Sequence, residues 1–314
     1  MAILTYVTLY ILAFLDLLKD LWLWSVAGFL IAAIVQEFVS TKSLLKYFGN
    51  NDWKSILRAT FSGLFISVCS CGAIPIAIML RKRGMSTATT LTFLLASPWG
   101  GVIHLFIMAS FVGVQNTLFL LTASLTVALI SGLILSRLED SRWIEPKVHA
   151  THKAGEKIKC GHCLTLEELG HKKEPLSRRI FYCIPRNMWC IFMGVGKYMV
   201  IGLFMAAALK VFVPPSIVTD FLGNGQKFLP VLLAVPIASV IELCSEGFTI
   251  LAGQLYTMGA SLGVVFTMIM VGVSTDFTEL SMIFGEFGKR SVAAYLTISI
   301  VLVILFAFLI NILL

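Results

Sequence analysis

The chain contains an internal repeat, and this repeat limits its fold more than any other feature of the sequence. The segment "CSCGAIPIAIMLRKRGMSTATTLT", which begins at Cys69, matches "CSEGFTILAGQLYTMGASLGVVFT", which begins at Cys244, without a gap. Eight of the 24 aligned positions are identical. A repeat of this length predicts two homologous membrane halves, residues 1–136 with an extra first helix and residues 194–314, joined by a polar segment at 137–193.

The composition places both halves in a lipid bilayer. Hydrophobic residues make up 58% of the 314 residues and charged residues only 13%, which is more apolar surface than one soluble core of this size can bury. The net charge of +7 comes from basic residues in short loops beside apolar segments, as in the cytoplasmic loops of membrane proteins. We therefore expect an all-α, multi-pass protein of the inner (plasma) membrane, with no nucleic-acid partner.

The charges also indicate how the two halves are oriented. Duplicated halves are typical of transporters, whose substrate site lies between the repeats near the middle of the membrane. The basic turn "RKRG" (81–84) aligns with the uncharged "YTMG" (256–259), whereas the uncharged "SFVGVQ" (110–115) aligns with the basic "GEFGKR" (285–290). The basic turn thus precedes the broken segment in the first half and follows it in the second half. The positive charge is therefore on the same side of the membrane only if the two halves are inverted copies. Parallel copies, which place the second basic turn outside, remain the alternative.

Each half has one apolar segment that is interrupted by a CSxG motif. Residues 59–80 have arms of about ten residues on either side of the motif, too short to cross a hydrocarbon core of ~30 Å alone. We therefore expect this segment, and its copy at 236–255, to form re-entrant hairpins with CSxG at the tips. Gly72, Pro75 and Gly247 are expected to break the helices there, because glycine and proline disfavour a continuous helix.

The motif residues predict a binding site for a soft metal or metalloid. Two inverted hairpins that meet in the membrane bring together three cysteines and their polar neighbours, namely Cys69, Cys71, Cys244, Ser70, Ser245 and Glu246. Thiolates select Cu(I), Zn(II) or trivalent arsenic and are poor ligands for an alkali ion or a sugar. The alternative is that these cysteines are small packing residues.

The apolar segment after each hairpin is long enough for two half-helices with a break between them. The first, residues 85–111, contains "ASPWGG" with Pro98 at the break, and the second, residues 260–284, contains "GVSTDFTEL". Ionisable groups in a membrane are costly and mark ion or proton pathways, so we assign proton coupling or an accessory role to Asp276, Glu279, His104 and Glu242. Solvated carboxylates near the membrane surface and a structural histidine are the alternatives.

The polar linker carries a second group of metal-ligand residues. Its CxxC pair with nearby histidines has the spacing of zinc and copper sites but lacks a complete four-ligand pattern, and the candidate ligands are Cys160, Cys163, His162, His149 and His152. A polar segment of this length with few aromatic residues cannot bury much surface. We expect a cytoplasmic loop that captures or senses metal, with a plain flexible linker as the alternative.

At these motifs the chain resembles a family of predicted permeases that includes the trivalent organoarsenical efflux permeases, and more closely its copper/zinc efflux branch. The resemblance rests on "SVCSCGAIPIA", "GMSTATTLTFLLASPWGG" and the second-half "CSEG", and it covers most of the membrane portion. It implies export of a thiophilic metal or metalloid from the cytoplasm, with Cys69, Cys71 and Cys244 as ligands. The motif does not specify which metal.

These features together predict a permease rather than an enzyme. No nucleotide-binding loop or nucleophile elbow occurs in the sequence, so we expect no resident cofactor and a metal ion as the transported substrate. Because metal and protons compete for thiolates and carboxylates, we expect alternating access coupled to protons. A homodimer is left open. Two other classes also remain: a membrane thiol-disulfide oxidoreductase, and a permease for a small sulfur compound or anion.

Overall fold

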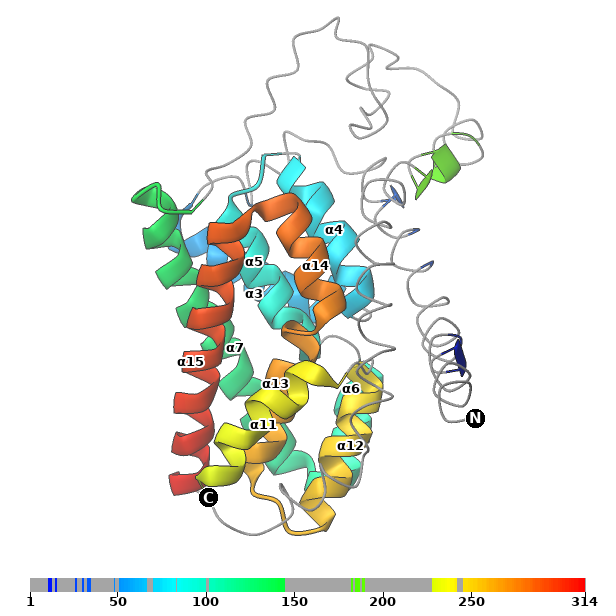
Figure 1. Cartoon of the computed structure of the whole chain (residues 1–314), viewed down its shortest axis with the longest axis vertical. Helices are drawn as coiled ribbons and strands as arrows, with labels where there is room; N and C mark the ends of the chain where they lie inside the picture. Colours follow the sequence, from blue (N-terminus) through cyan, green and yellow to red (C-terminus); the bar gives the residue numbers. More distant parts are fainter. Residues whose placement is uncertain are drawn as a thin grey trace, which may run out of the picture.

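The computed structural model consists of helices, shown in Figure 1, over all the segments that it describes. Apart from a few single residues elsewhere, the described residues are 51–66, 70–82, 84–99, 102–144, 228–241 and 245–313. The first helix of the chain and most of the linker therefore lie outside the described residues, as do the two hairpin tips at 67–69 and 242–244.

The helices fall into two sets of corresponding elements. The first set is α3 (Trp53–Ile66), α4 (Ser70–Lys82), α5 (Thr87–Ala96), the 3-10 helix η1 (Ser97–Trp99), α6 (Val102–Val112) and α7 (Val114–Asp140). The second set is α11 (Leu229–Val240), α12 (Ser245–Thr257), α13 (Leu262–Ser274), α14 (Phe277–Phe287) and α15 (Lys289–Leu313). Each of the helices α4, α5, α6 and α7 begins 175 residues before its counterpart, the same displacement that aligns the sequence repeat.

Glycines make the same sharp turns in both sets. Gly84 and Gly259 have φ of 95° and 100°, and Gly113 and Gly288 have φ of 87° and 81°. Backbone in this left-handed region is strained for residues with a Cβ, which explains the glycines at these turns. The second pair separates each half-helix from the long helix that follows it.

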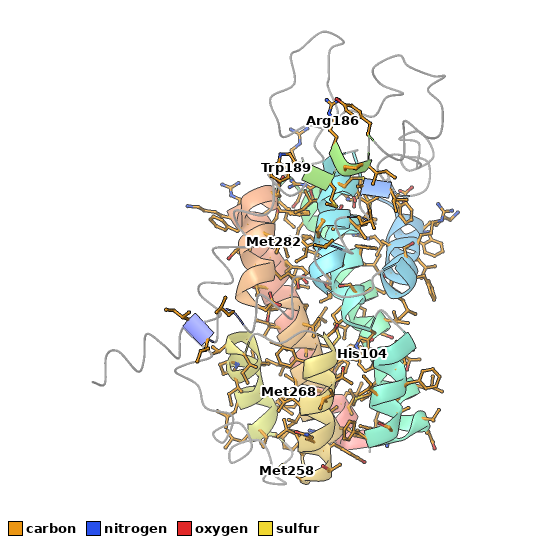
Figure 2. All side chains as sticks on the ribbon, turned by 90° about the vertical axis from the view of Figure 1, so that its right-hand side faces the viewer. His104, Arg186, Trp189, Met258, Met268 and Met282 are labelled. Carbon is orange, nitrogen blue, oxygen red and sulfur yellow. The ribbon has the colours of Figure 1, made fainter. Side chains whose placement is uncertain are left out.

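Corresponding helices run in opposite directions in space. In Figure 1, α7 rises from its teal lower end to its green upper end, whereas α15 descends to the red C-terminus at the bottom. Met258, Met268 and Met282 lie at increasing height in Figure 2, so α13 and α14 rise as well. The long helices α7 and α15 also contact each other, and they pack as an antiparallel pair.

The helix lengths fit a multi-pass membrane protein. The long helices α7 and α15 have 27 and 25 residues and are apolar enough to cross a bilayer. The other two candidate spans are bent pairs, in which α5 with η1 meets α6 at 53° and α13 meets α14 at 50°. The described residues thus contain two unbroken candidate spans, or four if each bent pair crosses the membrane as one unit.

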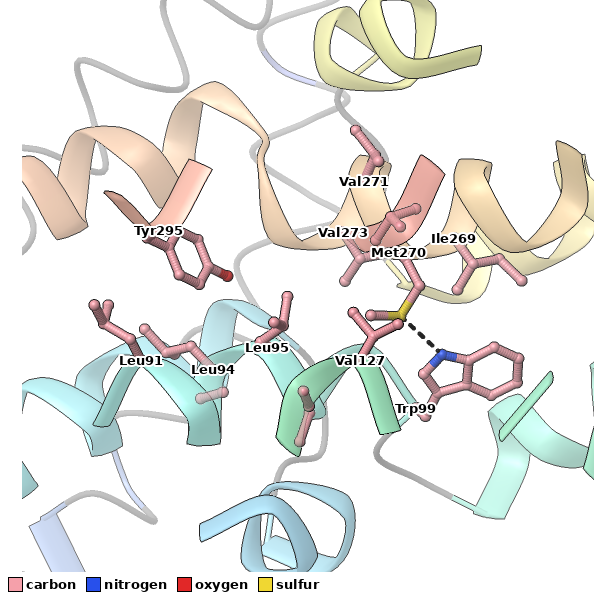
Figure 3. Close-up of a cluster of buried hydrophobic side chains, with 14 of the residues drawn as sticks. Leu91, Leu94, Leu95, Trp99, Val127, Ile269, Met270, Val271, Val273 and Tyr295 are labelled. Atoms are coloured by element: carbon pink, nitrogen blue, oxygen red, sulfur yellow. Dashed lines mark hydrogen bonds between the residues drawn. The ribbon is translucent and has the colours of Figure 1, made fainter. Parts of the chain in front are cut away.

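Helices α5 and α13, the first members of the two bent pairs, lie in the core of the described residues. Helix α5 packs between α3 and α7, and α13 packs between α11 and α15. Every residue of α5 is buried, as is every residue of α13 after its first. Figure 3 shows part of the core that results, where leucines of α5 face Met270 and its neighbours on α13.

Three of the four expected helix breaks differ from the structure. Helix α4 continues through Gly72 and Pro75, and α12 continues through Gly247. Proline removes one backbone donor, and Pro75, the sixth residue of α4, costs that helix one backbone hydrogen bond without ending it. Pro98 lies in η1, next to the bend of the first pair. The hairpin arms are also longer than expected, because α3 has 14 residues and α11 has 12.

The close contact between α5 and α7 gives a test of this packing. A Cβ added at Gly132 would lie 2.2 Å from Thr92 Oγ1 and 2.7 Å from Ile56 Cγ2. Gly132→Ala should therefore lower the free energy of unfolding by about 1–3 kcal/mol through overpacking, measured by denaturant unfolding in detergent. Adding Thr92→Ala should restore part of the loss.

A second alanine on the same helix serves as the control. Ser131 is buried, and its hydroxyl has no hydrogen-bond partner among the described residues. Ser131→Ala should therefore leave stability unchanged or raise it slightly. Equal stability of Gly132→Ala and the parent chain would contradict the packing of α7 on α5.

Candidate functional site

The two bent pairs touch where the first of them bends. Trp99, the last residue of η1, is fully buried, and its Nε1–H donates to Met270 Sδ of α13 at 3.2 Å (Figure 3). Helix α13 also contacts both η1 and α5. The bend of the first helix pair therefore packs against α13, the buried helix of the second set, and is hydrogen-bonded to it.

His104 lies just after this break and is bound by the second set. It is 1% exposed, and its Nδ1 lies 2.8 Å from the hydroxyl of Thr249 on α12. The edge of its ring meets the Trp99 ring, with centroids 5.3 Å apart. The Thr249 hydroxyl also donates to the Ser245 carbonyl at 2.7 Å. His104 thus contacts α12 one turn after the CSxG motif of the second half, at mid-height in Figure 2.

The break in the second set carries two buried carboxylates. Asp276 is 5% exposed and Glu279 is 1% exposed, so neither is a solvated group at the membrane surface. Asp276 is the N-cap of α14, and its carboxylate accepts a hydrogen bond from the Glu279 amide at 2.5 Å. A negative charge at a helix N-terminus is favourable. Glu279 occupies the position in α14 that His104 occupies in α6.

Side chains of neighbouring helices bind the backbone and a hydroxyl group at the second break. The Tyr295 hydroxyl of α15 donates to the Ser274 carbonyl at 3.2 Å. Ser239 of α11 and Thr275 place their hydroxyl oxygens 3.2 Å apart, and the Thr275 hydroxyl lies 2.7 Å from the Val271 carbonyl. Non-helical backbone in a membrane is tolerated where protein satisfies it in this way.

Most of the predicted metal ligands lie outside the described residues. Ser245 is buried at the start of α12, and Ser70, Cys71 and Glu246 lie in the first turns of α4 and α12, although their side chains are not described. The residues wholly outside the description are Cys69, Cys244, Glu242, Cys160, Cys163, His162, His149 and His152. The side chains that are described include no group of three or more His, Cys, Asp or Glu that could hold a metal ion.

Sequence analysis missed the polar groups that cap the two core helices. The Glu139 carboxylate of α7 accepts from the amides of Thr87 and Ala88 at 3.1 and 2.8 Å, at the start of α5. In the second set the Asn311 side chain of α15 accepts from the Gly263 amide at 2.8 Å. A signal was present, because a lone asparagine near the end of an apolar helix needs a hydrogen-bond partner.

The two sets also contact each other through α4 and α12. Helix α4 packs on α14, and α12 packs on α6. At the end of α4, buried Arg81 donates to the Glu286 carbonyl, and its guanidinium lies 4.3 Å from the centre of the Phe287 ring. The α12–α6 contact is apolar at the corresponding place, where Gly253 packs directly against Phe111.

The chain is similar to known proteins over nearly its whole length. A family described as "Predicted permease" matches residues 8–312. The "UPF0718 protein YcgR" of Bacillus subtilis is 27% identical over 93% of both chains. A "Putative two-component membrane permease complex subunit" of Streptococcus mutans is 24% identical over 95% of this chain and 94% of the relative.

A more distant relative extends the similarity to archaea. A UPF0718 protein of Methanocaldococcus jannaschii is 21% identical over 87% of both chains. No solved structure matches this one. Since the family match spans almost the entire sequence and the fold has helices suited to a bilayer, the chain belongs to this family of predicted permeases.

Proposed function

We propose that this permease exports a thiophilic metal or metalloid ion, Cu(I), Zn(II) or a trivalent arsenical, from the cytoplasm by proton-coupled alternating access. The observation that carries the proposal is the meeting of the two bent helix pairs. Their breaks lie in the protein core and hold His104, Asp276 and Glu279 at 1–5% exposure. Broken helices with buried polar groups form the substrate sites of many transporters.

The arrangement of the two helix sets supports inverted repeats as the basis of alternating access. Corresponding helices run in opposite directions in Figure 1, and each hairpin helix packs on the half-helix of the other set. In transporters built this way, one repeat rocks against the other around a fixed central site. In this proposal, the contact of α4 with α14 closes the central site toward one side of the membrane, and the contact of α12 with α6 closes it toward the other side. The two contacts open alternately.

The distribution of charge supports an orientation in the inner membrane. Toward the upper end of Figure 1, α4 and α7 end and α15 begins, and these helix ends carry Arg81, Arg137, Arg142, Lys289 and Arg290. Arg186 is labelled near the upper end of Figure 2. Positive charge accumulates on the cytoplasmic side of membrane proteins. We infer that this end and the linker that leaves it at residue 144 are cytoplasmic.

The cargo class follows from the motif residues. Cys69, Cys71 and Cys244 supply soft thiolates, with Ser70, Ser245 and Glu246 as their polar neighbours. The contact of His104 with Thr249, one turn after Ser245, supports a site near the second motif. The linker residues Cys160, Cys163, His162, His149 and His152 are assigned to the capture of metal on the cytoplasmic side.

Coupling to protons is assigned to the ionisable groups around the breaks. Asp276, Glu279, Glu242 and His104 each change charge on binding a proton, and metal binding requires deprotonated ligands. Competition between cargo and protons at one central site gives an exchanger. The Streptococcus mutans relative is named as a subunit of a two-component complex, and a second subunit or a second copy of this chain is accordingly proposed as a partner.

Transport by purified protein in proteoliposomes tests the substrate and the ligands. Offered separately, one of Cu(I), Zn(II), arsenite or methylated arsenic(III) should be transported saturably, at a rate that depends on the pH gradient. Cys69→Ser and Cys244→Ser should each reduce the flux to background, because each removes a thiolate, whereas Cys190→Ser outside the motifs should not. Flux that survives both motif substitutions would exclude the cysteines as ligands, and redox-dependent thiol trapping without flux would favour an oxidoreductase.

Fusion reporters test the orientation. Alkaline phosphatase attached after Leu314 should be active and green fluorescent protein at that position dark, because the C-terminus lies at the end opposite the basic residues. The same reporters attached after Trp143, at the basic end of α7, should give the reverse result. Reporter activity on the same side at both positions contradicts the proposed topology.

The contact of Arg81 with α14 gives a test of alternating access. Arg81→Gln removes the guanidinium that bridges the two sets at the cytoplasmic end, so the cytoplasmic closure should open more often. Labelling of Cys69 and Cys71 by a maleimide in inside-out vesicles should become several-fold faster. Arg137→Gln, at the same end on α7, is the control. An unchanged labelling rate in Arg81→Gln would show that this contact does not control access.

A further inference from the structure

A glycine allows α12 to lie directly against α6 of the other set. A Cβ added at Gly253 would lie 2.4 Å from Cγ, 2.5 Å from Cδ2 and 2.9 Å from Cβ of Phe111. Protein interiors are packed too densely to absorb contacts this short without a shift. Because the Phe111 Cβ moves only with its backbone, a rotation of the ring does not remove the clash. Only a residue without a Cβ therefore fits between the two helices at this point.

A second glycine brings α12 equally close to α13, in its own set. A Cβ added at Gly272 of α13 would lie 2.4 Å from both Cε1 and Cζ of Phe248, which is a fully buried residue of α12. Helix α12 is thus closely packed on one helix of each set. Interfaces packed in this way change between discrete arrangements rather than deform gradually. We therefore expect any movement of the sets to separate α12 and α6 as a whole.

The corresponding contact in the other half is of a different kind. The position of Gly253 is taken by Ile78 in the first repeat, and the position of Phe111 is taken by Glu286 in the second. There, Arg81 of α4 reaches α14 with its long side chain and donates to the Glu286 carbonyl. A side chain can withdraw while its helix stays in place. Contact between a helix backbone and a ring is lost only when the helices themselves separate.

The two contacts lie at opposite ends of the molecule. Helices α4 and α14 are in the upper part of Figure 1, and α6 and α12 are in the lower part. Met258, which follows α12, is labelled at the lower end of Figure 2. The contact between Gly253 and Phe111 is therefore in the half away from the basic helix ends, which the proposed function places in the cytoplasm.

We propose that Gly253 and Phe111 form the gate of the permease on the side opposite the cytoplasm, and that this gate opens when α12 separates from α6. The gate rests on the proposed function and deepens it, because it assigns residues to one of the two closures. In this structure the gate is closed. Added volume at the gate is relieved when the two sets move apart, whereas added volume inside one set is not relieved by that movement.

A distance measured between spin labels across the gate tests this assignment. Gln115 lies at the start of α7, just after α6, and Met258 lies just after α12; both side chains are exposed. The seven native cysteines are replaced by serine, and cysteines are introduced at these two positions for labelling. The parent chain should then give one distance by double electron–electron resonance. Gly253→Ala should add a second, longer distance.

Two further variants and a matched control separate gate opening from general overpacking. Phe111→Trp adds volume from the α6 side and should also produce the longer distance, so it carries the test if Gly253→Ala does not fold. Adding Phe111→Ala to Gly253→Ala removes the two nearest atoms and should restore the single distance. Gly132→Ala adds the same carbon between helices of one set and should leave the distance single. One unchanged distance in both Gly253→Ala and Phe111→Trp would overturn the proposal.

This measurement needs no cargo, so its outcome is separate from that of the transport assay. If the overpacked variants separate α12 from α6 but no cargo crosses the membrane in proteoliposomes, the movement stands and the export function is wrong. If the parent chain transports cargo while neither variant changes the distance, the permease function stands and the gate assignment is wrong.

Discussion

The constraint on which the rest of this structure depends is that backbone interrupted within a membrane must be paired by protein. Tyr295 of α15 meets this requirement at the second break by binding the Ser274 carbonyl, while Glu139 and Asn311 cap the starts of α5 and α13, the opposite ends of the helices that lead to the breaks. The unbroken helices α7 and α15 thereby fix the broken ones. The two breaks can then remain irregular and polar in the core at little cost.

The breaks lie where α4 and α12 each pack on a helix of the other set. Helix α12 packs on α6 and α4 packs on α14. Each set therefore contributes one helix that packs against the bent pair of the other set. His104 meets Thr249 as a result, in one of several contacts between the two sets. In the proposed mechanism, a site built from both sets would change when the sets move, which would link its occupancy to the closures at the two ends.

Sequence reasoning located the elements better than it located their contacts. The repeat, the two bent segments and the equivalence of His104 with Glu279 follow from patterns within one segment or between aligned ones. The partner of His104 lies 145 residues away, and only the packing of α6 on α12 decides it. The prediction that Gly72, Pro75 and Gly247 break the helices was wrong, because a helix held by tertiary packing accommodates a residue such as Pro75. The cap formed by Asp276 could have been predicted from the sequence, since D-x-x-E before an apolar run is a known helix start.

The central claim is that the cargo is held where the breaks of the two helix sets meet. The most direct measurement is an anomalous-scattering map of crystals grown with Zn(II), collected at the zinc absorption edge. We predict a peak between the two breaks, near His104 and the start of α12. A peak found only in the linker, or at either end of the helices, would contradict the account.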